Sequence, residues 1–179
     1  LVDGIAHHLY GTGLDNLDLD ALAALGELGR ERQRPVFLSE MHAEPLTTAV
    51  LLHSVFVVEG AVTYVHNGFV GSAAAREPDR SAIVTLTRED FQLGDNYHVL
   101  GQYSAHLGPD WIRVAADVDR AELLASAWIS PEDDVLVVIL TNPGPTGIVA
   151  QLMGTERAAT GSTMVRTVLG GLERSAELG

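Results

Sequence analysis

A short, continuous apolar run at residues 35–39, PVFLS, is the feature that most constrains how this chain can fold. Uninterrupted runs of this length are typical of strands that are buried on both faces of a parallel sheet. Similar apolar runs occur at residues 2–10 and 61–70. Because parallel strands need long crossover connections, we expect helices between the three runs.

Both connecting segments carry helix signals. Asp18 or Asp20 can cap a helix that ends in a basic cluster just before Pro35, and that proline prevents the helix from continuing. Pro45 can occupy the first turn of a second helix, which is predicted to reach about Val58. The order is therefore strand, helix, strand, helix, strand, which is two consecutive parallel crossover units.

The sequence pattern changes beyond Pro109. A polar loop at residues 71–80, a hairpin-like element at 83–90 and a helix at 97–107 precede this boundary. Beyond it, apolar segments of strand length alternate with turn signals, which predicts an antiparallel β region. The expected strands of this region are residues 112–118, 123–129, 135–141, 148–153 and 164–169. Residues 170–179 carry little pattern.

Composition excludes several classes of function. The 179 residues include 24 acidic and 11 basic side chains, and the net charge of −13 opposes binding to nucleic acid. The absence of cysteine excludes disulfides, thiolate zinc sites and cysteine nucleophiles. The longest apolar stretch, residues 45–65, is interrupted by polar residues and predicts no membrane span. Residue 1 is leucine and no signal peptide precedes the first apolar run, so we expect the natural N-terminus to lie upstream.

Polar side chains gather where the three predicted parallel strands end. In parallel α/β sheets, catalytic groups project from the carboxyl ends of the strands. One carboxylate among imidazoles, a phenol and an amide suits carbonyl, glycosyl or metal chemistry, and composition alone leaves these three open. The three strand ends carry His7, His8 and Tyr10; then Ser39, Glu40 and His42; then His66 and Asn67.

Four short segments carry a family resemblance: HLY at residues 8–10, SE at 39–40, TYV at 63–65, and YHVLGQYS at 97–104, continuing through Pro109 to Arg113-Val114. Together they resemble the C-terminal part of glycoside hydrolase family 30, which contains glucosylceramidase-like and xylanase-like enzymes. The resemblance implies an α/β plus β fold. Residues 1–109 would be about the last three strand–helix units of a (β/α)8 TIM barrel, and residues 110–179 an antiparallel β-sandwich, whole or truncated. The missing N-terminal half of the barrel would lie upstream.

The resemblance also implies the chemistry of the site. Glu40 corresponds to the nucleophile of a retaining hydrolase that acts on β-linked glycans or glycolipids, and its carboxylate would form a glycosyl-enzyme ester. Tyr10 matches the tyrosine that donates a hydrogen bond to this nucleophile, which favours the ionised carboxylate. A secreted or extracytoplasmic location is implied by the family alone. The sugar site would be lined by His8, His42, His66 and Asn67.

Two parts of the family pattern are absent. The family places its acid/base in an Asn-Glu-Pro segment at the end of the fourth barrel strand, and no such segment occurs here. Ala43-Glu44-Pro45 is better explained as a helix start, with Glu44 near the positive end of the helix dipole. The tryptophan that many relatives carry at the third strand end is replaced by His66-Asn67-Gly68. We therefore expect the acid/base upstream and this chain to be inactive by itself.

Two other interpretations stay open at this point. A non-catalytic carbohydrate-binding or interaction module, built on residues 110–179, would account for both absences. A metal-dependent hydrolase would need clustered ligands, but no His-Glu-x-x-His spacing occurs and His53, His98 and His106 fall on predicted helices. We therefore expect no metal and no cofactor. Trp111 and Trp128 are expected to be core residues rather than sugar platforms.

Overall fold

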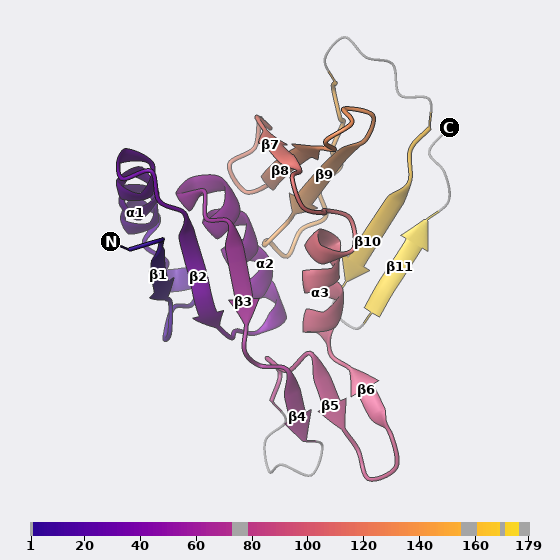
Figure 1. The fold of residues 1–179 in the computed structure, drawn as a ribbon. Helices are drawn as coiled ribbons and strands as arrows, with labels where there is room; N and C mark the ends of the chain where they lie inside the picture. Colours follow the sequence, from indigo (N-terminus) through magenta and orange to yellow (C-terminus); the bar gives the residue numbers. More distant parts are fainter. Residues whose placement is uncertain (1, 73–78, 155–160, 169–170, 176–179) are drawn as a thin grey trace.

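The computed structural model describes residues 2–72, 79–154, 161–168 and 171–175. It has a mixed α/β architecture in which a parallel sheet occupies one side and the C-terminal strands the other (Figure 1). Two helices, α2 (Pro45–His53) and α3 (Asp95–Ser104), pack against each other between these two parts. The layered arrangement places the carboxyl ends of the parallel strands at one exposed edge.

The predicted order of strands and helices in the first part of the chain is confirmed. The parallel sheet has the order β1-β2-β3, and α1 and α2 form the two crossovers. The side chain of Asp18 accepts a hydrogen bond from the amide of Ala21 at 2.9 Å, so it is the cap of α1. The bounds are β1 (Ile5–His8), α1 (Leu19–Glu31), β2 (Val36–Met41) and β3 (Thr63–His66).

The second predicted helix consists of two segments of different helix type. The α-helix α2 continues directly into the π-helix η2 (Ser54–Glu59), which ends at Gly60. Gly60 has a φ of +74°, a left-handed conformation that glycine adopts without a steric penalty. The prediction located the end of this helical region but not the change of helix type.

The core of this part lies on one face of the sheet. Val36, Leu38 and Met41 of β2 pack against Leu51 and Val55 of the α2–η2 region. The opposite face differs from the prediction that residues 35–39 are buried on both sides. On this opposite face, the β2 side chains Phe37 and Ser39 are only half-buried, and the β1 side chains Ala6 and His8 are exposed. No described element covers this face of the sheet.

A small sheet follows the parallel one. The single strand predicted at residues 61–70 is wrong: β3 ends at His66, and residues 67–69 separate it from a new strand. Gly68 allows this break because a Cβ atom there would lie 3.1 Å from the Ser81 hydroxyl and 3.2 Å from its carbonyl oxygen. The predicted hairpin exists but extends to residue 93. The sheet is formed by β4 (Val70–Ser72), β5 (Val84–Leu86) and β6 (Phe91–Leu93).

The C-terminal part is β-rich, as predicted, with two corrections. Residues 148–153 form no strand, and Val149 is 99% exposed, so an apolar composition alone did not produce strand pairing there. A strand within residues 170–179 was missed, because its pairing with the preceding strand is not visible as a sequence pattern. The antiparallel strands are β7 (Ile112–Val114), β8 (Leu124–Ile129) and β9 (Leu136–Thr141) in one sheet, and β10 (Met164–Val168) with β11 (Gly171–Ser175) in another.

A second core joins the helices to this β-rich part. Leu52 of α2 and Tyr103 of α3 pack against Trp128 and Ile139 of β8 and β9. Tyr103 and Trp128 meet edge to face, with ring centroids 5.5 Å apart. Trp128 is thus a core residue, as the sequence predicted.

None of the helices in the described ranges is both long and apolar enough to cross a membrane.

Candidate functional site

The three parallel strands bring the predicted site residues to one edge. His8 of β1 lies opposite Glu40 of β2, and Met41 lies opposite His66 of β3. Because parallel strands end at the same edge, residues that are 32 and 25 positions apart in the sequence become neighbours.

An irregularity in β2 decides which way Glu40 points. Val36 and Leu38 are buried against the helices, and strict alternation would bury residue 40 next. The register instead shifts on both sides of β2, between Leu38 and Met41, so that Met41 takes the buried position. Ser39 and Glu40 both remain half-buried at the bulge. The carboxylate therefore leaves the helix-covered core.

Glu40 is held by two hydrogen-bond donors. The amide Nδ2 of Asn67 donates to Glu40 Oε1 at 2.6 Å and lies 3.0 Å from the Tyr10 hydroxyl. Tyr10 also hydrogen-bonds Glu40, and this bond is the largest reason that the pKa of the Glu40 carboxyl lies below its ordinary value. The bond to Asn67 is the second reason. The same interaction with Glu40 raises the pKa of the Tyr10 phenol, so Tyr10 stays protonated and can donate.

Two histidines complete the cluster. His8 Nε2 lies 3.8 Å from Glu40 Oε2, and its ring meets the Tyr10 ring edge to face. His42 Nδ1 lies 3.0 Å from Asn67 Oδ1, which orients the amide so that its nitrogen faces Glu40. The result is a partly exposed, ionised carboxylate surrounded by a phenol, an amide and two imidazoles. Such a group can act as a nucleophile, a base or an acceptor for ligand hydroxyl groups.

His66 lies at the same edge but makes different contacts. Its Nε2 is 2.8 Å from the carbonyl oxygen of Ser81, and burial lowers its pKa. Asp79, close to this histidine, accepts hydrogen bonds from the Ser81 amide and hydroxyl, and the hydroxyl bond is the main reason that the pKa of Asp79 lies below its ordinary value. The structure thus brings together His8, Tyr10, Glu40, His42 and Asn67, whereas the His66 side chain, at the end of β3, contacts the adjoining loop at Ser81.

Glu44 has the position that the helix-start interpretation predicts. It directly precedes α2, is exposed, and lies 3.9 Å from Arg80.

Among the described residues, no group of three or more histidine, aspartate or glutamate side chains could hold a metal ion.

Sequence reasoning missed two buried polar groups. Asn96 is fully buried at the start of α3 and donates hydrogen bonds to two loops. Glu59 is fully buried at the end of η2, with Oε1 2.6 Å from His7 Nε2. Burial raises the pKa of Glu59, although His7 partly offsets this effect. No sequence signal marks either group, because each is defined by partners that are distant in the chain.

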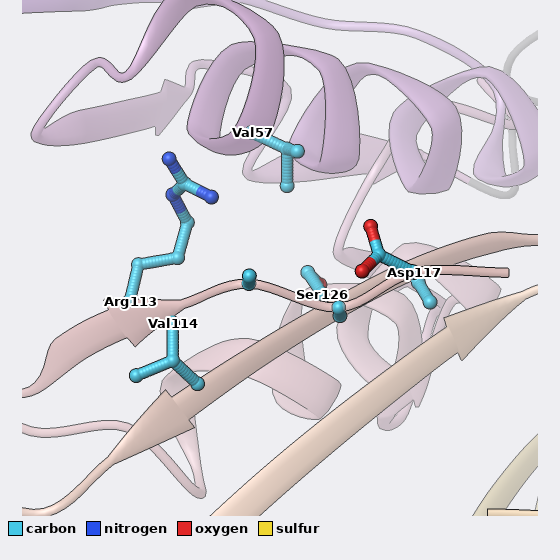
Figure 2. A pocket seen from close by; sticks show the side chains of 8 residues that line it. Val57, Arg113, Val114, Asp117 and Ser126 are labelled. Atoms are coloured by element: carbon cyan, nitrogen blue, oxygen red, sulfur yellow. The ribbon is translucent and has the colours of Figure 1, made fainter.

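A cavity of about 240 Å³ lies away from Glu40, between η2 and the strands β7 and β8. Figure 2 shows Val57 on the helical side, with Arg113 and Asp117 at opposite ends. Val114 and Ser126 complete the labelled lining. None of the predicted site residues lines this cavity, so it is separate from the Glu40 site.

The fold defined by these elements is similar to that of larger solved proteins. SrfJ from Salmonella typhimurium matches 99% of this chain over 38% of its own length, with a TM-score of 0.64 and 11% sequence identity. The catalytic domain of GH30 xylanase C from Talaromyces cellulolyticus matches 60% of this chain over 27% of its own, with a TM-score of 0.52 and 16% identity. At these identities the likeness concerns the fold alone, and the chain corresponds to a part of each protein. No family model and no curated protein matches the sequence.

Proposed function

We propose that this chain is the C-terminal portion of a retaining glycoside hydrolase that acts on β-linked glycans or glycolipids, with Glu40 as the nucleophile. The observation that carries this proposal is the Glu40 carboxylate, held at the carboxyl edge of a parallel sheet by Tyr10 and Asn67. The fold likeness to a GH30 xylanase catalytic domain supports the choice of glycosyl chemistry over carbonyl or metal chemistry.

The contacts of Glu40 suit nucleophilic attack on a sugar. The donors Tyr10 and Asn67 favour the ionised carboxylate, which is the form that can attack an anomeric carbon. One Glu40 oxygen would bond to that carbon while the bond to the leaving oxygen breaks, and water would later release the sugar with retention. His8 and His42 are placed beside the carboxylate and would bind sugar hydroxyl groups.

The proposed enzyme needs residues outside this chain. In the proposed division, residues 1–109 supply the end of a TIM barrel and residues 110–179 a β-sandwich. The upstream half of the barrel would cover the open face of the β1–β3 sheet and supply an acid/base about 5–5.5 Å from Glu40. Without that group, protonation of the leaving oxygen is lost, which costs about 10²- to 10⁴-fold in rate. The chain alone should therefore be inactive.

The test is a substitution in the complete protein. Glu40→Gln keeps the size of the side chain but removes the nucleophile, so hydrolysis of an aryl β-glycoside should fall by at least about 10³-fold. Glu44→Gln, four residues away and exposed, is the matched control and should retain the parental rate. A Glu40→Gln variant that hydrolyses the substrate at nearly the parental rate would show that the assignment is wrong.

A non-catalytic carbohydrate-binding module is the second candidate. The observation in its favour is the cavity of Figure 2, where Arg113, Asp117 and Ser126 could bind hydroxyl groups. Trp128 is buried in the core and offers no sugar platform on that part of the chain. Calorimetry with β-linked oligosaccharides separates the two candidates: binding that survives Glu40→Gln but is lost in Arg113→Ala supports the module.

A further inference from the structure

We propose that Asn96 is a positioning residue for this site: it holds the backbone next to His42 and the Ser81 carbonyl that the His66 side chain contacts, and so orients the amide of Asn67 that holds Glu40. This inference rests on the proposed function, because it names a residue that prepares Glu40 for the reaction. Asn96 acts through the loops and has no role in contacting a substrate.

The Asn96 side chain is buried and its donor group is fully used. It is the second residue of α3 and has 0% of its surface exposed. Its Nδ2 atom donates to the carbonyl oxygen of Ala43 at 2.8 Å and to that of Ser81 at 2.8 Å. A buried amide that lacks partners is costly, so α3 can pack in this place only with both loops held.

The two carbonyl groups lie beside the Glu40 network. Ala43 directly follows His42, whose Nδ1 lies 3.0 Å from Asn67 Oδ1. Ser81 also accepts from His66 Nε2 at 2.8 Å, and His66 directly precedes Asn67. One hydrogen bond of Asn96 therefore holds the residue that follows His42. The other holds the carbonyl group that His66, the residue before Asn67, also contacts.

The orientation of Asn67 is what this arrangement controls. Nδ2 must face Glu40 for the 2.6 Å hydrogen bond to form, and His42 at Oδ1 sets that orientation. If the backbone at His42 or His66 shifts, this bond lengthens, and the pKa of Glu40 rises towards its ordinary value. The other polar and titratable groups that face Glu40 are Tyr10, His8 and His42. An Asn96 substitution leaves all of them in the sequence.

The test measures the protonation of Glu40 without requiring activity. In the complete protein, a carbodiimide and an amine couple to protonated carboxyl groups, and peptide mass spectrometry reports the yield at Glu40 as a function of pH. Asn96→Leu removes both donors at similar volume, so labelling of Glu40 at a fixed pH above its midpoint should increase about three- to tenfold. Labelling of the exposed Glu44 should not change. Equal Glu40 labelling in the variant and the parent would overturn the inference.

Two further variants control for loss of stability. Thr48→Val removes the buried hydroxyl that donates to the same Ala43 carbonyl at 3.1 Å, so it should shift Glu40 labelling in the same direction by less. If Asn96→Leu does not fold, Glu40 labelling in Thr48→Val that equals the parent's overturns the inference instead. Ile139→Ala weakens the core at β9 without touching these loops, and its Glu40 labelling should match the parent. A shift as large as that of Asn96→Leu would mean that Asn96 matters only for global stability.

The readout also separates this inference from the proposed function. If Asn96→Leu shifts the labelling of Glu40 but the parent hydrolyses no β-glycoside, the positioning of Glu40 by Asn96 stands and the hydrolase proposal fails. If the parent hydrolyses such a substrate and the labelling does not shift, the positioning role fails and the hydrolase proposal stands.

Discussion

Two glutamates beside the β1–β3 sheet, Glu40 at its open edge and Glu59 on its helix-covered side, have opposite surroundings. At the open edge, Glu40 is bound by Tyr10 and Asn67, and these donors lower its pKa. On the helix-covered side, Glu59 is fully buried against His7, and burial raises its pKa. The comparison shows that the sheet separates a carboxylate whose surroundings favour its charge from one whose surroundings oppose it. Two side chains of the same chemical identity can therefore have opposite pKa shifts because their surroundings differ.

The largest expected effect on stability is at the buried pair. His7→Ala leaves the Glu59 carboxyl buried without its partner, which should lower the free energy of unfolding by about 3–5 kcal/mol. His8→Ala, at the neighbouring position on β1, is the matched control. His8 is exposed, and its contact with Glu40 is long, at 3.8 Å. Its effect should not exceed about 1 kcal/mol. Urea unfolding of the complete protein measures both, and similar losses would remove the contrast between the two faces.

A smaller effect is expected where α1 approaches Glu59. A Cβ atom at Gly26 would lie 1.9 Å from the Glu59 carbonyl oxygen, so Gly26→Ala must push α1 away from η2. We expect a loss of about 1–3 kcal/mol. Gly101→Ala in α3 is the control, since no atom lies within 4 Å of the added methyl group, and it should stabilise the protein by about 0.5–1 kcal/mol. If both variants are stabilised, the α1–η2 contact is looser than described.

The smallest effect is a difference in pH dependence, and it has opposite signs at the two glutamates. The pKa of Glu59 is raised, so as the pH rises past the ordinary value of 4.5 the unfolded chain ionises first and stability falls. The pKa of Glu40 is lowered, so its contribution is present above 4.5 and is lost as the pH falls. Glu59→Gln should therefore reduce the stability that the protein loses as the pH rises above 4.5. Glu40→Gln should reduce the stability that it loses as the pH falls below 4.5. Unfolding measured from about pH 3 to pH 7 tests this, and identical profiles for both variants would contradict it.

The candidate cluster could be predicted because its members follow the ends of recognisable strands. Tyr10 ends the apolar run at 2–10, Glu40 directly follows the run at 35–39, and Asn67 lies in the polar part of the run at 61–70. Parallel pairing brings such positions together. The parallel order was predictable for the same reason, since capping at Asp18 and the proline before α2 mark the crossovers.

The rest depended on contacts that no local pattern encodes. Asn96 and Ser81 are 15 residues apart and Asn96 and Ala43 are 53 apart, so their hydrogen bonds exist only in the folded chain. Glu59 follows an apolar helix segment and gave no sign that it would be buried. Residues 148–153 have the composition of a strand but form none, because composition does not supply a pairing partner.

The bulge that turns Glu40 outward has a dynamic consequence. The register shifts at the same level on both neighbours of β2, so the three strands share one interruption of their hydrogen-bond ladder. Backbone amides at residues 39–40 should therefore exchange with solvent deuterium sooner than those at 36–38, where the ladder is regular. The segment that presents the carboxylate is then the first part of the sheet to open locally, and its order becomes sensitive to whatever binds against that edge.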